Sequence, residues 1–492
     1  MKSHFLRLGQ QTLVYGIGAV AQQILGVITL PIYARVFDPS AYGVVEVITV
    51  GLSVVVIMID LGLTSAAQRS YFDYDDSQEQ ARRVVLSTWM APSMVLATAF
   101  GAGIAVANHP IAVALFSSGR YGRAVLLTGL ALPALTLAVC TREVMRLRFQ
   151  PWQYLGSSLV TGVIGTAVSI TLVLATHLGV AGVFAGMLAG NVLAAVYGLI
   201  VALPHLTPRI SRRELQIMVA FGVPLIPSAI SAWALQFVDR ILLTKLASLK
   251  EVGEYAVANR LALGLLLIVS AFGIAYSPFM LSLHSEDPEA ERQVRARLLT
   301  YVTAGLMAIA VVLSLFAREI VAVIAPSYHK TYQAVALVCL GTVALGVSQV
   351  TMSEITLTRR TKLFALYAVI AAVINLGLNF ALIPPWGQIG AAAATAVGYI
   401  ALALLYHYGA QRIAPVPTPY QDGKLVAISV LGIALMPIGL LGSGSVWDLL
   451  AKVGGVVALL VGLRVIGVLG PEEIAAVEGF LAGMRKHRSA KA

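Results

Sequence analysis

Residues 30–43 read LPIYARVFDPSAYG, and this stretch joins two long apolar segments. Asp38-Pro39-Ser40 marks the break, because proline suits the first turn of a new helix. The apolar run before the break reaches back to about residue 9, and the run after it continues to about residue 68. A transmembrane helix needs ~20 consecutive, mostly apolar residues. The stretch therefore predicts the end of one membrane-spanning helix and the start of the next.

Long apolar runs separated by short gaps continue outward from this break through the whole chain. Hydrophobic residues make up 58% of the sequence and charged residues 12%, whereas about a quarter of an average soluble domain is charged. This composition excludes a soluble protein. We predict an all-α polytopic membrane protein of about fourteen transmembrane helices. The predicted spans are 9–36, 41–68, 83–107, 124–147, 153–177, 181–203, 216–246, 253–282, 298–318, 332–358, 363–385, 389–410, 424–442 and 446–467.

Lysine and arginine gather in every second gap between the apolar runs. The eight basic segments hold 24 of the 34 basic residues. Short loops rich in lysine and arginine stay on the cytoplasmic side, so both termini are predicted to be cytoplasmic. The net charge of +11 is explained by this bias and by contact with anionic lipid. We therefore expect membrane lipid, and no nucleic acid, as a partner.

The chain contains a diverged internal repeat with an offset of 210 residues. Arg35 lies eight residues before Gly43, and Lys245 lies eight residues before Gly253. Because the offset covers six predicted helices, an even number, both halves have the same orientation and are expected to be related by a pseudo-two-fold axis along the membrane normal. The predicted parts are an N-terminal lobe (1–210), a C-terminal lobe (211–415), two additional helices (416–470) and a cytoplasmic tail helix (471–492).

Basic side chains inside the apolar runs mark a candidate binding site. A charge that faces lipid at mid-membrane costs at least ~2.5–3.5 kcal/mol, so such residues are expected to face a cavity between the lobes. Arg240 and Arg260 lie furthest inside their runs, and a guanidinium can bond two phosphate oxygens at once. We predict that both bind a phosphate group, with Arg35 and Lys245 as further candidates.

Acidic residues in the same runs have two possible roles. The candidates are Asp60, Asp239, Glu46 and Glu354. A protonatable carboxylate such as Asp60 or Glu354 could couple transport to proton entry, since the chain has no P-loop to hydrolyse a nucleotide. In the structural alternative, Asp239 pairs with Arg240, Glu46 pairs with Arg35, and Asp60 caps a helix end or pairs with Arg69.

No motif predicts an enzyme. The eight histidines show no HExxH or HxxxH spacing, and Cys140 and Cys339 lie far apart in apolar runs. Asp73-Tyr74-Asp75 has the Asp-x-Asp spacing that some glycosyltransferases use to hold a metal, but it lies in a short acidic loop that we interpret as solvated. We expect no catalytic residue, no metal and no cofactor.

Short stretches in both halves carry a family resemblance. They are residues 9–11 and 30–43, DLGL at 60–63, FGVPL at 221–225, VDRILL at 238–243 and EVGEYA at 251–256. The chain resembles the polysaccharide-biosynthesis flippases, the Wzx-type branch of the MOP exporter superfamily. The resemblance implies two six-helix lobes around a central cavity. It also implies export of an undecaprenyl-pyrophosphate-linked oligosaccharide to the outer leaflet of the bacterial inner membrane, with other polysaccharide-assembly proteins as partners.

Two other functions stay open as alternatives. A MATE-like drug or cation antiporter of the same superfamily is expected to use acidic cavity residues to bind a cation. The predicted helices in 216–282 carry arginines instead, which argues against this function. A membrane glycosyltransferase or polymerase usually needs a sizeable extramembrane region for its catalytic cleft, and the predicted loops are too short for one. We expect a transporter without covalent chemistry.

Overall fold

The computed structural model describes residues 23–176, 178–357, 361–413, 421–441 and 445–468. All regular elements in these ranges are helices, and 12 helices are long and apolar enough to cross a membrane. This confirms the predicted all-helical membrane class. The count of about fourteen spans stays a prediction. Only Gln23–Val36 of the first predicted span is described, and the single helix Lys362–Arg412 covers two predicted spans.

The helices of the first half, together with the residues that separate them, form what we call the N-terminal bundle. They are α2 (Pro39–Asp60), α3 (Leu63–Phe72), α4 (Glu79–Val106), α5 (Asn108–Phe116), α6 (Gly122–Leu147), α7 (Pro151–Leu159), α8 (Gly165–Ala175) and α9 (Val180–Ala202). Short turns at Asp76–Gln78 and Gly119–Tyr121, a π-helical turn at Val160–Ile164 and a 3-10 turn at Leu203–His205 complete it.

The second half begins with α10 (Arg212–Gly222), which leads through a 3-10 turn at Val223–Leu225 into the C-terminal bundle. That bundle consists of α11 (Ile226–Leu246), α12 (Leu249–Glu286), α13 (Pro288–Leu315), α14 (Ala317–Ile324), α15 (Tyr332–Leu357) and α16 (Thr361–Ile413). Two more helices follow, α17 (Asp422–Leu435), extended by a 3-10 turn at Met436–Leu440, and α18 (Val446–Val465).

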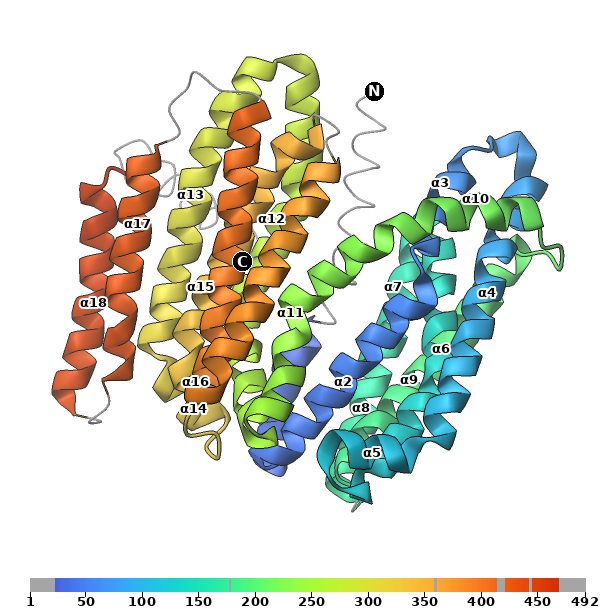
Figure 1. Ribbon diagram of the computed structural model, residues 1–492, viewed down its shortest axis with the longest axis horizontal. Helices are drawn as coiled ribbons and strands as arrows, with labels where there is room; N and C mark the ends of the chain where they lie inside the picture. The colour runs from blue at the N-terminus through green and yellow to red at the C-terminus, as the bar shows by residue number, and fades with distance from the viewer. Residues whose placement is uncertain (1–22, 177, 358–360, 414–420, 442–444, 469–492) are drawn as a thin grey trace, which may run out of the picture.

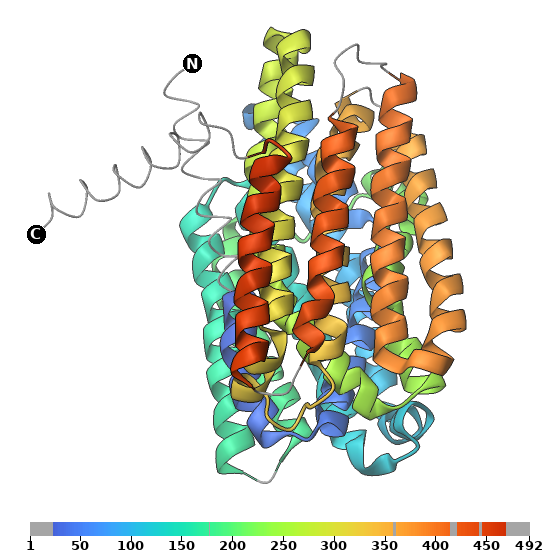
Figure 2. The ribbon, with the colours of Figure 1, turned by 90° about the vertical axis from the view of Figure 1, so that its left-hand side faces the viewer.

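The two bundles are joined at one end of the molecule. Within the N-terminal bundle α6 packs against α4 and α9, and within the C-terminal bundle α15 packs against α13 and α16. The main contact between the bundles is made by α2 and α12. Figure 1 shows that the ribbons meet near α5 and α14 and diverge toward α3 and α10. Helices α17 and α18 lie outside this pair and pack against α13 (Figure 2). The lobe limits given above stay predictions.

The predicted span 41–68 is interrupted, which corrects the expectation of one continuous helix. Helix α2 ends at Asp60, and both Leu61 (φ 47°) and Gly62 (φ 71°) have left-handed backbone conformations. The Asp60 carboxylate accepts hydrogen bonds from the amides of Gly62 (3.1 Å) and Thr64 (3.2 Å). A side chain that bonds nearby amides competes with the helical hydrogen bonds, so the Asp60 carboxylate favours the end of α2 at this point.

Four other connections between helices are defined in the structure. Gly179 and Gly387 each form a tight connection, and both have φ +53°. Pro224 lies in the 3-10 turn between α10 and α11. The expected loop between 282 and 298 is mostly helical: α12 continues to Glu286, and Asp287 caps α13. Figure 2 shows this helical hairpin rising above its neighbours.

Candidate functional site

The joined end is closed by two glycines that allow α2 and α12 to touch backbone to backbone. A Cβ atom added to Gly43 would collide with the Leu249 carbonyl oxygen, and one added to Gly253 would collide with the Pro39 carbonyl oxygen. Tyr42 packs edge-on against Tyr328 beside them, with ring centroids 6.1 Å apart. Gly43 and Gly253 are the positions that the 210-residue offset relates. We call this contact the α2–α12 seal.

Arg35 and Lys245 each reach across the seal to the opposite bundle. Arg35 Nη2 donates to the Val323 carbonyl oxygen at 3.2 Å, in the last turn of α14. Lys245 Nζ donates to the Ala114 carbonyl oxygen at 2.7 Å, in the last turn of α5. Both basic side chains are exposed. Cations are stabilised at helix C-termini, where carbonyl groups lack helical partners. Two of the predicted phosphate ligands thus hold the bundles together.

Asp239 and Arg240 lie in a buried network beneath the seal, with exposed fractions of 1% and 5%. Arg240 Nη1 pairs with Asp239 Oδ1 at 3.0 Å, and its Nε pairs with Glu46 Oε1 on α2 at 3.2 Å. Asp239 Oδ2 accepts hydrogen bonds from the Tyr255 hydroxyl (2.6 Å) and from Thr395 Oγ1 (3.1 Å). The guanidinium is therefore held between two carboxylates.

This network decides between the ion pairs suggested by the sequence. The Asp239–Arg240 pair is confirmed. The Arg35–Glu46 pair is wrong, because Glu46 bonds to Arg240 and Arg35 bonds to a carbonyl oxygen of α14. The physical reason is that the buried Arg240 guanidinium needs a carboxylate partner and the half-buried Glu46 lies within reach of it, whereas Arg35 is exposed.

Arg260 differs from Arg240 in its surroundings. It lies on α12 and is half-buried. Its Nη1 donates to the Gly26 carbonyl oxygen at 3.3 Å, and no carboxylate of the described part of the chain lies within ion-pair distance of its guanidinium. Of the four predicted basic residues, Arg260 is the one inside the membrane region that forms no ion pair with a described acid. It is therefore the best placed to meet an anion.

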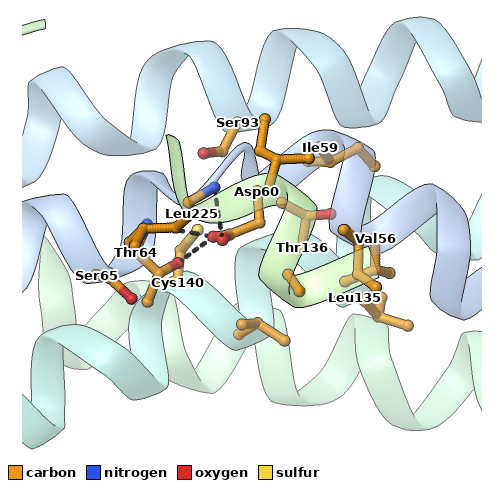
Figure 3. Close-up of a pocket in the computed structure, with 15 residues that line it drawn as sticks. Val56, Ile59, Asp60, Thr64, Ser65, Ser93, Leu135, Thr136, Cys140 and Leu225 are labelled. Carbon is orange, nitrogen blue, oxygen red and sulfur yellow. Dashed lines mark hydrogen bonds between the residues drawn. The ribbon is translucent and has the colours of Figure 1, made fainter. Parts of the chain in front are cut away.

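A pocket of about 420 Å³ lies beside Asp60 and touches both halves of the molecule (Figure 3). Its walls come from α2, α3, α4 and α6, and from Leu225 with the start of α11. Most lining groups are apolar, and the polar ones include Asp60, Thr64, Ser93 and Thr136. The Asp60 carboxylate accepts a hydrogen bond from the Thr64 hydroxyl as well as from backbone amides, so it acts as the cap of α3.

The remaining predicted residues take no part in these sites. The side chain of Glu354 lies outside the described residues. Asp75 caps the short turn that follows it and accepts from the Ser77 amide at 2.9 Å, which agrees with a structural acidic loop. Within the described ranges no group of three or more His, Cys, Asp or Glu residues could hold a metal ion.

Sequence reasoning missed one buried charge. Lys452 on α18 is fully buried, pairs with Asp448 at 3.4 Å and pairs with Glu319 in the first turn of α14. The spacing of Asp448 and Lys452, four residues apart on an apolar helix, was a signal, because such residues lie on one helix face. Because Glu319 is part of α14, this cluster anchors α18 to the C-terminal bundle.

The sequence matches a known protein family, and the fold is similar to those of solved structures. A family model described as polysaccharide biosynthesis protein matches residues 8–284, more than half of the chain. No curated protein matches the sequence. The solved structure of the lipid II flippase MurJ in an inward closed conformation is similar, with a TM-score of 0.72 and 18% identity, over 92% of this chain and 98% of that chain.

Other solved structures share the fold at lower identity. An inward-facing multidrug resistance MATE family transporter of the MOP superfamily has a TM-score of 0.64 at 13% identity, over 80% of this chain and 94% of that one. A MOP superfamily transporter from Pyrococcus furiosus has a TM-score of 0.61 at 12% identity, over 84% and 96%. At these identities the likeness shows the fold, which is that of MOP superfamily transporters.

Proposed function

Because this chain belongs to the polysaccharide biosynthesis protein family, we propose that it is a flippase for a lipid-linked oligosaccharide. The cargo is an undecaprenyl-pyrophosphate-linked glycan, carried from the inner to the outer leaflet of the bacterial inner membrane. The observation that carries the proposal is the family match together with a fold used by flippases and exporters. The protein moves this cargo across the membrane and makes or breaks no covalent bond.

Alternating access fits the way the two bundles are joined. The α2–α12 seal closes the end that the charge pattern predicts to be outer, and the ribbons diverge toward the predicted cytoplasmic end (Figure 1). Arg35 and Lys245 cross the seal by exposed hydrogen bonds to carbonyl oxygens. An exposed hydrogen bond contributes only about 0.5–1.5 kcal/mol net, because water replaces it on opening. Such contacts favour closure of the outer end without locking it.

Arg260 is our first candidate for the pyrophosphate contact. It forms no ion pair with an acid of the described chain, and a guanidinium can bond two phosphate oxygens. Arg240 comes second, since a phosphate would have to displace Glu46 or Asp239 from it. Asp60, beside the pocket of Figure 3, is the candidate for proton coupling, in addition to its role as a helix cap.

A MATE-like drug or cation antiporter is the second candidate, favoured by the shared fold. The pairing of Asp239 and Glu46 with the same arginine argues against it. Each carboxylate that neutralises a buried guanidinium is less available to bind a cation.

The direct test uses cells that lack their own oligosaccharide flippase and contain this chain. We expect export of the surface glycan to be restored and ethidium efflux to stay at background. In proteoliposomes, a fluorescent undecaprenyl-pyrophosphate-linked sugar should become accessible in the second leaflet faster with the protein than with empty vesicles. Ethidium efflux without glycan movement would instead support the antiporter.

A further inference from the structure

A second cavity, of about 640 Å³, opens near the α2–α12 seal and separate from the pocket of Figure 3. It lies between the first turn of α12, the start of α15 and the kink of α16. Its polar and aromatic lining consists of Glu251, Lys330, Gln333, Trp386 and Gln388. The charge pattern of the loops predicts that this end of the molecule faces the outside.

The kink at Gly387 builds one wall of this cavity. The φ of +53° lets the chain turn there, and a Cβ atom at this position would lie 2.6 Å from Glu251 Oε2. Glu251 can therefore approach closely and accept a hydrogen bond from the Gln388 amide at 2.8 Å. Trp386, on the other side of the kink, is left with 57% of its surface exposed.

The side chain of Gln388 has a buried acceptor without a donor. Gln388 is 2% exposed, and its Nε2 donates to Glu254 Oε2 at 2.8 Å. A carboxylate accepts hydrogen bonds, so the amide nitrogen faces Glu254 and the amide oxygen faces away. That oxygen, Oε1, has no hydrogen-bond partner in the described part of the chain. Buried acceptors are almost always paired, so a donor from a ligand suits this position.

The geometry points to a carbohydrate-binding subsite, and we propose that it receives a sugar unit of the translocated glycan at the outer face. This inference rests on the proposed function. An exposed indole face offers a surface for the C–H face of a sugar ring. Glu251 and Gln388 Oε1 offer acceptors, and Lys330 and Gln333 offer donors, which matches hydroxyl groups that donate and accept.

The mixed charge of the lining favours a polyhydroxylated ring over a simple ion. Lys330 disfavours a free metal cation in the same cavity, and Glu251 disfavours a free phosphate. A pocket of apolar surface with a few fixed polar groups is the usual form of a small-ligand site. The cavity is large enough for a sugar unit and not for a long oligosaccharide.

The test measures binding of the free oligosaccharide, released by mild acid from the lipid-linked pool of the source cells, to the full chain in detergent. We expect saturable binding that Trp386→Ala weakens roughly tenfold, since an aromatic contact is worth up to ~1.5 kcal/mol beyond its area. Trp386→Phe should keep part of the affinity. The matched control is Trp447→Ala, because Trp447 is also exposed, at 80%, and lies outside the cavity.

Each outcome has a defined meaning. Weaker binding in Trp386→Ala, with Trp447→Ala and the melting temperature unchanged, supports the subsite. Equal binding by Trp386→Ala and wild type overturns it, and so does an equal loss in both tryptophan variants, which indicates a general membrane-interface effect. If wild type exports glycan in cells and does not bind the free oligosaccharide, the subsite is wrong while the flippase proposal stands.

Discussion

The α2–α12 seal and the Arg240 network lie close together and use the same residue types in opposite ways. In the seal, Arg35 and Lys245 are exposed and bond to main-chain carbonyl oxygens. In the network, Arg240 is buried between two carboxylates. Exposed bonds can be exchanged for bonds to water at little cost, whereas a buried ion pair cannot be broken without leaving an unpaired charge. The difference separates contacts suited to opening from contacts that must persist.

The largest effect is expected from breaking the network. Asp239→Asn keeps the shape of the side chain and removes its charge, which leaves Arg240 with Glu46 as its one carboxylate. Removing one partner of a buried pair costs about 3–5 kcal/mol. We expect a clear loss of folded protein in the membrane and a lower melting temperature in detergent. Unchanged stability would mean that the network is dispensable to the fold.

The next effect comes from forcing the seal apart. Gly43→Ala and Gly253→Ala each place a methyl group against a backbone carbonyl oxygen of the other helix, so α2 and α12 must separate. We expect transport to fall at least about tenfold, since overpacking typically costs 1–3 kcal/mol. Gly51→Ala and Gly264→Ala are matched controls on the same two helices, because nothing lies within 4 Å of an added Cβ. Equal activity of all four variants contradicts close packing as the basis of closure.

Arg260 sharpens the comparison, because it is neither a seal contact nor part of the network. Arg260→Ala should abolish glycan export with little change in melting temperature, since the structure assigns it one hydrogen bond, to Gly26. Arg260→Lys should restore transport in part, because lysine keeps the charge and loses the two-pronged geometry. A fully active Arg260→Ala protein would remove this residue from the proposed pyrophosphate site.

The smallest effects are expected from Arg35→Ala and Lys245→Ala. Each removes one exposed hydrogen bond, worth about 1 kcal/mol, which shifts the balance of closed and open outer ends about fivefold. A cysteine in place of buried Val252, beside Gly253 in the seal, reports this opening through its labelling by an impermeant maleimide. The background should lack Cys140 and Cys339. Labelling that is equally slow in both variants argues that neither residue holds the seal.

The sequence predicted the class of the fold more completely than the site. Apolar run lengths and composition were enough for the all-helical membrane class, and the 210-residue offset related Gly43 to Gly253, which touch in the structure. The break after Asp60 was missed, because its cause is a local one, the bonding of the Asp60 side chain to backbone amides, which the length of an apolar run does not show. The pairing of Glu46 with Arg240 was missed because it joins residues 194 positions apart.

The acceptors in the seal have a consequence for how the protein can change over generations. Arg35 and Lys245 bond to the backbone of residues 323 and 114, and every amino acid has that carbonyl group. Positions 323 and 114 are therefore free to drift in side chain without loss of the contact. Only the two donors need to stay basic. Related chains should therefore keep a basic residue at positions 35 and 245 and vary freely at positions 323 and 114. Substitutions at a donor position should not be accompanied by substitutions at its acceptor position.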